Sequence, residues 1–465
     1  MNESDTPLDH DTEPDAAASD DSGHDELLEP PDLSFEEASS SEVSEPDRRD
    51  LTGEKAVSPA QEGVLKGDVG VEKALTAICV FIMIILGGIA FSNIFIGPFF
   101  GESQRLIVEN EPLHHIATFS DALDPEPVLR PLTMFTFALN WRFSEFSPVG
   151  FRVVNLLLHL LNGVLVFFLC KRLFKCADAV AMVAGLLFLV HPATAESVNY
   201  IVGRSGLLVT TFTLLAILSY LRTTRNTERL NFGLLAFSLV CFVLAWASDN
   251  AGLGIPILIL VADFVVNGPR MRLPRLAIHA VFWAVLLVLL CIQQQVFDVG
   301  AETTAPSAAF FDVFWEYLRL SAAPRELTVE HYLAPPGILG GPPISMGLVA
   351  FALLAIATLA LLVKRSPLGF GLFLFLVTLN AMGPLLPADL ALSERALYLP
   401  LVGAVLVAPW LIEQVLAFRS LRKIIGVAAA VLILAAATGT FYRNAAWHSA
   451  EALWTDAKSK SPAAV

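Results

Sequence analysis

The feature that most constrains this chain is a series of apolar runs, each long enough, or nearly so, to cross a lipid bilayer. The hydrocarbon core of a bilayer holds no water to satisfy peptide groups, so spanning segments of this kind form helices. The sequence therefore predicts an all-α polytopic membrane protein with about eleven transmembrane helices, inside a membrane domain at 72–441. The runs lie at about 74–96, 151–170, 177–190, 204–221, 231–247, 251–268, 276–294, 345–363, 368–386, 396–413 and 423–440.

Basic residues follow these runs on alternate sides. If the N-terminus is cytoplasmic and the runs alternate in direction, every short basic cluster falls in a cytoplasmic link, as the positive-inside rule requires. We therefore expect a cytoplasmic N-terminus and an external C-terminus, in a bacterial inner membrane, or in the endoplasmic reticulum membrane if the chain is eukaryotic. The clusters are Lys171, Arg172 and Lys175; Arg222, Arg225 and Arg229; Arg270, Arg272 and Arg275; Lys364 and Arg365; Arg419, Arg422 and Lys423.

Two long loops fall on the outer side, at 97–150 and 295–344. The first holds two helix-like pieces, near Pro112–Ala122 and Pro131–Phe143, and the second holds an amphipathic piece, Phe310–Leu320. Loops of this length in a compact protein are usually functional. We therefore expect the functional site at the outer face.

The acidity of the chain comes from its N-terminus. Residues 1–50 hold 18 Asp and Glu against 2 Arg, a balance of -16, while the whole chain carries -15. A segment so charged and so poor in large apolar side chains cannot offset its ordering entropy. We predict a disordered acidic cytoplasmic tail at 1–65, either a solvated spacer or a docking arm, and the net charge says nothing about the substrate.

Several chemistries find no motif here. The chain has no Gly-rich phosphate loop, no His-Glu-x-x-His and no nucleophile elbow, which argues against a soluble nucleotide-binding enzyme. Its 5 cysteines lie in or beside apolar runs and form no CxxC. Adjacent His114 and His115 in a loop are a weak metal signal. The sequence predicts no metal site, no disulfide framework and no nucleic-acid partner.

The stretch Phe188–Arg204 interrupts the apolar pattern. A run stops at His191-Pro192, a short passage carries Glu196, and Arg204 leads directly into the next run. Ionisable side chains this close to hydrocarbon are costly, so they favour a functional interpretation.

A polar stripe lies within the second run. Residues 152, 155, 159 and 162 share one helical face, so Arg152, Asn155, His159 and Asn162 must face a neighbouring helix or a wet cavity. For Asn155, His159 and Asn162 the alternatives are interhelical hydrogen bonds and a ligand site. We expect Arg152, near the outer mouth, to face an anion.

Arginines and one glutamate mark the outer loops. The arginine fork matches phosphate oxygens, so several arginines beside a membrane cavity suggest a lipid-linked phosphate; the alternative is ion pairing with nearby acids or lipid headgroups. Glu102 lies just outside the first run, where a carboxylate either acts as a general base or simply faces water. The arginines are Arg130, Arg142, Arg204, Arg319, Arg325 and Arg395.

The order of these motifs resembles one family, the transmembrane-and-tetratricopeptide-repeat proteins. These belong among the C-type glycosyltransferases, near the protein O-mannosyltransferases, and the resemblance covers about residues 72–465. The stretches that carry it are Arg130–Asn140, Phe151–Asn162, His191–Glu196 with Gly203-Arg204, Tyr317–Tyr332, Glu394–Pro400 and Arg443–Pro462.

The resemblance implies a C-type glycosyltransferase-like fold and a membrane enzyme that moves a sugar from a polyprenyl-phosphate carrier to an acceptor hydroxyl at the periplasmic or lumenal face. An acid in the first outer loop, here Glu102, would be the base. The acceptor would be a protein or a glycan, and 442–465 would be the outer start of a truncated tetratricopeptide-type segment. Substrate and lipid-phosphate contacts would fall on Arg130, Arg152, His159, His191, Glu196, Arg204, Glu394, Arg395 and Tyr398.

Two positions depart from the pattern of this family. Its members carry two adjacent aspartates where this chain has Glu102 and Ser103, and Lys-Glu where it has Asp249 and Asn250. The alternative is therefore a catalytically inactive scaffold or lipid-binding protein of the same fold. A transporter ranks last, because Asp263 is the main charge in the inner half of the spans.

Overall fold

The computed structural model describes residues 59–123, 130–224, 231–270, 273–297, 309–329, 331, 344–382 and 392–461. Within these ranges the chain forms helices and turns, with one isolated antiparallel bridge between His331 and Leu392 and no β-strand. The acidic segment expected at 1–65 lies almost entirely outside the described residues. Its end does not, because the first helix begins at Pro59.

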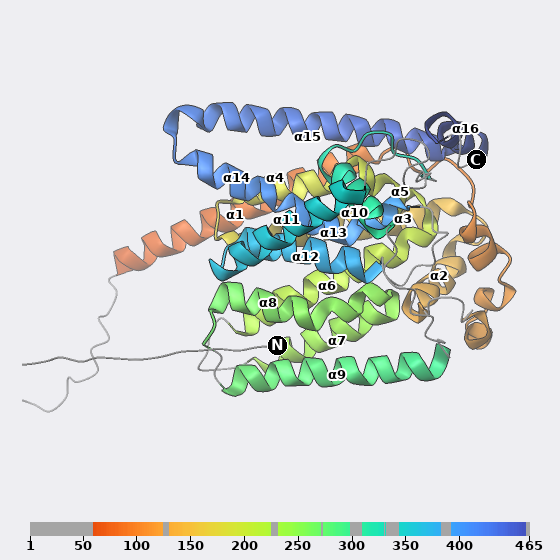
Figure 1. Ribbon diagram of the computed structural model, residues 1–465, viewed down its shortest axis with the longest axis horizontal. Helices are drawn as coiled ribbons and strands as arrows, with labels where there is room; N and C mark the ends of the chain where they lie inside the picture. The colour runs from red at the N-terminus through yellow and green to blue at the C-terminus, as the bar shows by residue number, and fades with distance from the viewer. Residues whose placement is uncertain are drawn as a thin grey trace, which may run out of the picture. The chain divides into compact units, whose positions relative to one another are not determined.

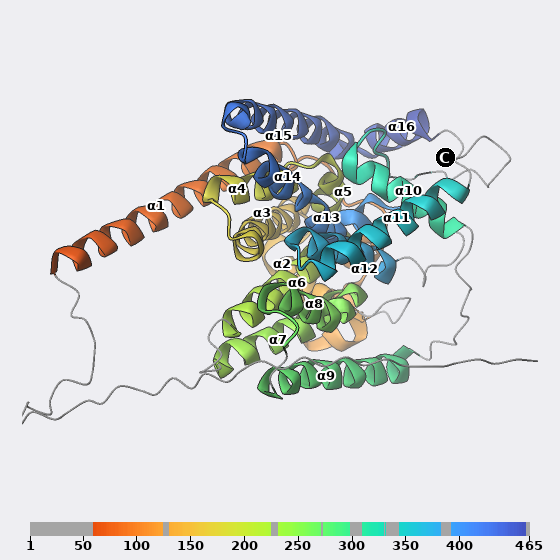
Figure 2. The same ribbon diagram turned by 60° about the vertical axis from the view of Figure 1, so that its left-hand side comes forward.

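The prediction of an all-α polytopic membrane protein is confirmed. The described residues contain eight helical segments long and apolar enough to span a bilayer, one bent helix pair that passes the same test, and two shorter apolar helices. Together these match the eleven predicted runs, and they run roughly parallel in both ribbon views (Figures 1 and 2). The helices are α1 (Pro59–Ala90), α3 (Pro148–Phe174), α4 (Asp178–Leu189), α6 (Arg204–Thr223), α7 (Phe232–Ser248), α8 (Ile255–Asn267), α9 (Leu273–Phe297), α11 (Ile344–Val363), α12 (Pro367–Met382), α13 (Tyr398–Val405) with α14 (Val407–Leu416), and α15 (Arg422–Ala445).

Short helices gather at one end of the long ones. The helices α2 (Pro131–Ser144), α5 (Ala195–Asn199) and α16 (Ala450–Lys460) lie at the right in Figure 1. The helical pieces expected in the two outer loops are present, as two 3-10 helices at Glu111–His114 and Ile116–Ala122, as α2, and as α10 (Ala309–Ala322).

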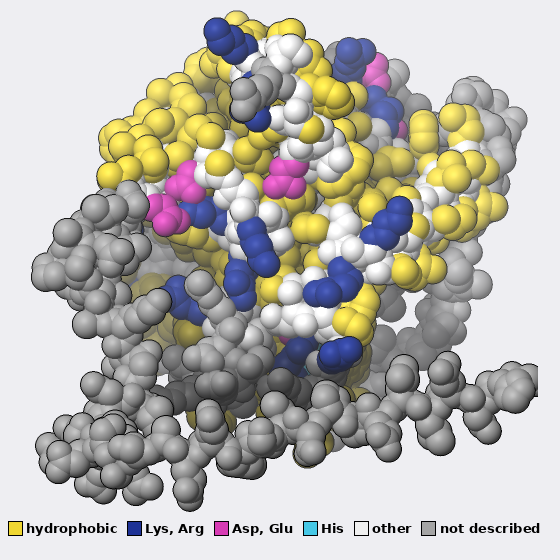
Figure 3. All heavy atoms as spheres, turned by 90° about the vertical axis from the view of Figure 1, so that its left-hand side faces the viewer, with side chains coloured by type: hydrophobic (Ala, Val, Ile, Leu, Met, Phe, Trp, Pro, Cys, Tyr) yellow, Lys and Arg dark blue, Asp and Glu magenta, His cyan; other side chains and the backbone are white. Residues whose placement is uncertain are grey.

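The other end of the long helices carries those residues of the predicted basic clusters that the structure describes. Arg172, in the last turn of α3, donates to the carbonyl of Leu221 in α6 at 2.6 Å, and Arg365 after α11 donates to Val265 of α8 at 3.3 Å. Figure 3, which looks at the left end of Figure 1, shows Lys and Arg side chains gathered there among apolar ones. This is the distribution that the positive-inside rule describes. The assignment of this end to the cytoplasm stays a prediction.

The passage between α4 and α6 is a buried, bent connection. The chain turns by 51° between Asp178–Leu189 and Pro192–Asn199. Pro192 lacks an N–H and forces an extended residue before it, and His191 there accepts a hydrogen bond from the N–H of Ala193 at 3.3 Å. A side chain at Gly203 would lie 2.6 Å from the carbonyl oxygen of Ser197, so only glycine fits there. The turn brings Glu196 to the end that carries the short helices.

A buried charge cluster, here called the clasp, joins α9 to α8 near the end opposite the short helices. It consists of Asp263, Asn267, Arg275 and His279. Asp263 of α8 is fully buried and accepts hydrogen bonds from Arg275 at 2.6 Å and Asn267 at 2.7 Å, with His279 Nε2 at 3.1 Å. Only 22% of the spanning window of α9 is buried, so most of that helix faces away from the protein. A buried carboxylate of this kind is stable only while its cationic partner is present.

We predict that Asp263→Asn destabilises the protein by about 3–5 kcal/mol, because it leaves the Arg275 cation buried without a counter-charge. The measurement is unfolding of the purified protein in nanodiscs, followed by tryptophan fluorescence. The matched control is Lys364→Gln, an exposed charge at the same end, which we expect to change stability by less than about 0.5 kcal/mol. Equal stability of the two variants would contradict the clasp.

Candidate functional site

Arg395 is the centre of the site. It lies on the single 3-10 turn η7 (Glu394–Leu397), directly before α13. Its Nη1 is 3.4 Å from the carboxylate of Glu102, and its Nε is 4.0 Å from that of Glu196. Its guanidinium lies over the ring of Tyr200, 5.2 Å from the ring centre. The structure thus brings together three predicted residues from three distant segments.

Glu102 is the accessible acid of this group. Its side chain is 48% exposed, and its backbone N–H donates to the hydroxyl of Tyr200 at 3.0 Å. The preceding Gly101 has φ +47°, and a side chain there would come within 3.3 Å of the same hydroxyl. The chain therefore holds Glu102 in place through its backbone and leaves the carboxylate free to meet a ligand.

Tyr200 is a site residue that the sequence analysis missed. Burial raises its pKa, and the charge of Glu102 raises it further, so the hydroxyl stays protonated near neutral pH. An available signal was its position at the end of the polar passage, directly after Asn199 and before the next apolar run. Aromatic rings beside an arginine are common cation–π partners.

Glu196 is the buried acid of the group. The hydroxyl of Ser393 donates to its Oε1 at 3.0 Å, whereas its Oε2 is buried and has no hydrogen-bond partner among the described residues. An unsatisfied buried oxygen costs free energy, and the guanidinium of Arg395 compensates part of that cost. Glu196 therefore contacts Arg395 from the buried side, and Glu102 contacts it from the exposed side.

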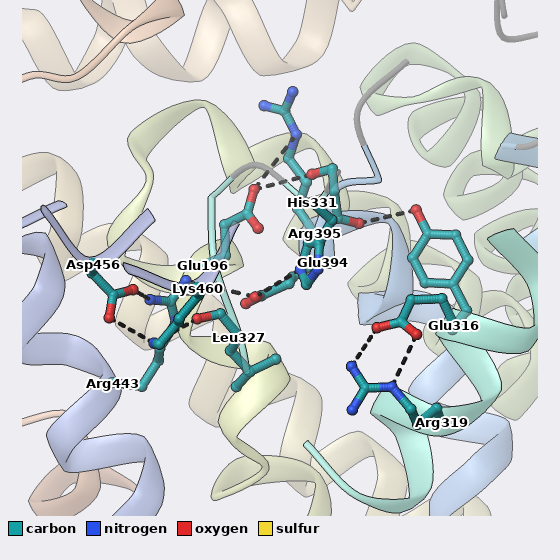
Figure 4. A network of polar contacts seen from close by, with 12 residues as sticks. Glu196, Glu316, Arg319, Leu327, His331, Glu394, Arg395, Arg443, Asp456 and Lys460 are labelled. Atoms are coloured by element: carbon teal, nitrogen blue, oxygen red, sulfur yellow. Dashed lines mark hydrogen bonds and ion pairs between the residues drawn. The ribbon is translucent and has the colours of Figure 1, made fainter. Parts of the chain in front are cut away.

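Glu394, the residue before Arg395, makes a different set of contacts. Its carboxylate is fully buried, 3.6 Å from Nη2 of Arg443 and 3.3 Å from Nε2 of His331. Figure 4 shows these contacts beside those of Arg395, and also an ion pair between Arg319 and Glu316 on α10. Glu394 and Arg395, neighbours in one short turn, thus have different charged partners: Arg443 and His331 for Glu394, and Glu102 and Glu196 for Arg395.

His159 and Tyr398 hold helices together. The Tyr398 hydroxyl lies 2.8 Å from Nδ1 of His159 and accepts from Asn162 at 3.2 Å, and Nε2 of His159 lies 2.9 Å from the carbonyl of Leu189. All three side chains are buried. Their contacts are the interhelical hydrogen bonds that the sequence analysis left as an alternative, and they do not reach Arg395.

Arg152 is fully buried, and its guanidinium donates to backbone carbonyls. These belong to Gly97 at 2.6 Å, Pro98 at 2.8 Å and Asn199 at 3.2 Å. The sequence analysis expects an anion here, but the donors of Arg152 are used to fasten the segment that leaves α1. Because Glu102 follows in that segment, Arg152 supports the site without facing it.

Arg204 is also buried, in a cage without a carboxylate. It donates to Asn140 at 2.7 Å, Asn155 at 2.9 Å and the carbonyl of Phe151 at 3.0 Å, and it lies 4.7 Å from the ring centre of Phe137. These contacts join α2 and α3 to the start of α6. The predicted phosphate contact would compete with them, and Arg204 is not among the contacts of Glu102 or Glu196.

Arg130 and His191 lie outside the Arg395 group. Nε of Arg130 is 3.5 Å from the carboxylate of Asp249, one of the two positions that depart from the expected family pattern. Nε2 of His191 lies 3.2 Å from the carbonyl of Ser321, in the last turn of α10. Among the residues that the structure describes, no three His, Cys, Asp or Glu side chains are grouped to hold a metal ion.

Comparison with curated proteins identifies relatives of the chain, although no family model matches it. It is 26% identical to human protein O-mannosyl-transferase TMTC3 over 378 residues, covering 70% of this chain and 40% of that protein. It is 31% identical to human protein O-mannosyl-transferase TMTC4 over 174 residues, covering 31% of this chain and 24% of that protein. It is 40% identical to Drosophila melanogaster protein O-mannosyl-transferase Tmtc1 over 99 residues, covering 21% of this chain and 11% of that protein.

The chain is a homologue of these proteins. The resemblance drawn from its motifs is therefore confirmed. The matched part corresponds to 40% or less of the length of the relatives named here, so their activity does not transfer to this chain without further argument.

The contacts of Arg204 and Arg395 predict that substitution by lysine destabilises the protein strongly at Arg204 and only slightly at Arg395. In Arg204→Lys the single ammonium cannot reach all the acceptors, so we expect a loss of about 3 kcal/mol in the free energy of unfolding. In Arg395→Lys, at a side chain that is 35% exposed, we expect a change of less than about 1 kcal/mol. Urea unfolding of both variants in the same detergent measures the difference. A stable Arg204→Lys would refute the structural role of the cage.

Proposed function

We propose that this protein is a membrane glycosyltransferase that moves a sugar from a polyprenyl-phosphate carrier to an acceptor hydroxyl at the outer face. The observation that carries the proposal is the contact between Glu102, an accessible carboxylate, and Arg395, a half-buried cation. The names of the relatives support mannose as the sugar and a protein hydroxyl as the acceptor. The bilayer and the lipid-linked sugar are then its partners.

Arg395 is the group proposed to hold the phosphate of the donor. Its fork can donate two parallel hydrogen bonds to phosphate oxygens. Its present partners are carboxylates at 3.4 and 4.0 Å, distances longer than a charge-assisted hydrogen bond, so a phosphate can displace Glu102 from it. Arg130, the other partly exposed candidate from the sequence, lies outside this group and pairs with Asp249 at 3.5 Å, so the phosphate contact is assigned to Arg395.

Glu102 is the proposed general base. When the donor phosphate takes its place beside Arg395, the Glu102 carboxylate is released from its ion pair and is free to accept a hydrogen bond from the acceptor hydroxyl. Its backbone bond to Tyr200 keeps it at the mouth of the site, where an acceptor hydroxyl can approach. Geometry of this kind comes before basicity in the choice of a base.

The proposed reaction is a single displacement. The acceptor hydroxyl gives its proton to Glu102 while its oxygen forms a bond to the anomeric carbon of the sugar. The bond from that carbon to the phosphate oxygen breaks, and its electron pair leaves with the polyprenyl phosphate. The charge that develops on the phosphate faces Arg395, whose guanidinium stabilises the transition state.

We predict that Glu102→Gln lowers kcat for sugar transfer by about 10²–10⁴-fold, because the amide cannot accept the proton. The assay uses purified full-length protein in nanodiscs, a polyprenyl-phosphate mannose donor and a Ser/Thr-containing peptide. The matched control is Glu109→Gln, an exposed glutamate of the same loop, which we expect to keep the wild-type rate.

Two results would contradict the proposal in different ways. An unchanged rate in Glu102→Gln would remove the base assignment. A wild-type protein that binds polyprenyl phosphate but transfers no sugar from any carrier would favour the alternative, a non-catalytic lipid-binding member of the same fold.

A further inference from the structure

Glu394 belongs to a set of polar contacts, here called the ring, that joins η7 to Arg443, to α16 and to the segment of Leu327 and His331 (Figure 4). From Glu394 the ring passes to Arg443 at the end of α15 and then to α16. It returns through the segment that follows α10, where Leu327 and His331 lie. The contacts are Glu394–Arg443 at 3.6 Å, Arg443–Asp456 at 2.8 Å, Asp456–Lys460 at 2.6 Å, Lys460 to the Leu327 carbonyl at 2.8 Å, and His331–Glu394 at 3.3 Å.

The ring provides the partners of the buried Glu394 carboxylate. That carboxylate is fully buried, and its Oε2 has no hydrogen-bond partner among the described residues, so it depends on Arg443 and His331 for compensation. Arg443 is itself buried and lies between two carboxylates, those of Glu394 and Asp456. Buried charges are held only where their partners are well placed, so a shift of one member is transmitted to the next.

The turn η7 is fixed at both of its ends. Before it, Leu392 forms the antiparallel bridge with His331, and Ser393 accepts at its carbonyl from the Tyr317 hydroxyl at 3.1 Å; at its end, Leu397 is fully buried. Between these ends, Glu394 anchors the turn on the side of Arg443, and the next residue, Arg395, reaches Glu102 and Glu196. The position of the Arg395 guanidinium therefore depends on these end contacts together with the contacts of Glu394.

We propose that Arg443 and Asp456 are positioning residues for Arg395, and that the C-terminal helix α16 thereby sets how tightly the site binds the donor phosphate. The inference rests on the proposed function, because it takes Arg395 as the phosphate-binding residue. Asp456 lies on α16, is 22% exposed and makes no contact with Arg395 or Glu102, so it acts only through the ring.

The test uses the full chain in nanodiscs and measures binding of polyprenyl phosphate without a sugar. In Asp456→Asn the ring opens at Arg443, and we expect the Kd to rise about tenfold, because small displacements at a binding group have effects of this size. The unfolding midpoint stays close to the wild-type value, because Glu394 still neutralises the buried Arg443, and Asp456→Glu restores most of the affinity. Glu451→Gln, an exposed acid on the same helix, is the control and binds as the wild type does.

A second readout separates positioning from a general structural role. In the sugar-transfer assay, Asp456→Asn raises the KM for the donor and leaves kcat nearly unchanged, whereas partial unfolding lowers the apparent kcat alone. If Asp456→Asn does not fold, Lys460→Gln opens the ring at its other side and is expected to weaken binding in the same direction.

The outcomes for the ring and for the proposed function are distinct. If Arg395→Gln loses polyprenyl phosphate and Asp456→Asn binds it as the wild type does, the ring inference is overturned and the proposed function stands. If Arg395→Gln also binds normally, the phosphate assignment of the proposed function fails. A loss of binding in Asp456→Asn that only parallels a lower unfolding midpoint overturns the ring inference too.

Discussion

Every polar group carried into this helical bundle must find its partner within the protein, because the surrounding hydrocarbon offers none. Arg152 and Arg204 show how this requirement organises the end of the bundle that carries the short helices. Both side chains are buried, and both donate hydrogen bonds to neutral oxygens of the protein. Arg152 donates to backbone carbonyls, and Arg204 donates to two asparagine side chains and one backbone carbonyl. In doing so Arg152 fastens the segment after α1, which carries Glu102, and Arg204 joins α2 and α3 to α6.

Arg395 differs from those two arginines in its surroundings. Its side chain is 35% exposed and its partners are two acids at ion-pair distance, so part of its hydrogen-bonding capacity remains available to a ligand. A cation that is shielded from bulk water yet open on one side interacts more strongly with an anion than a surface arginine does. The rigid cages around the buried arginines and the openness of Arg395 are therefore two parts of one arrangement.

The helices were accessible from the sequence because hydrophobic length and basic flanks are local signals. All eleven apolar runs have a helical counterpart, including the short, bent one around His191-Pro192. The roles of the charged residues could not be predicted from the sequence in the same way. Arg204 and Arg395 both follow polar stretches, yet one is caged and the other open, because their partners come from segments distant in the chain. Tyr200, Arg443 and Asp456 were missed as site residues for the same reason.

One departure from the family pattern, Asp249, changes the charge balance among the arginines. Asp249, at a position where a lysine is expected, pairs with Arg130 at 3.5 Å, so an acid stands in place of one cation and occupies a second one. Arg395 is then the cation that contacts Glu102, and its placement matters more than it would in a site with several cations. A site that depends on one arginine requires a rigid support for that arginine. The buried Glu394, held by Arg443 and His331 directly behind it, meets this requirement.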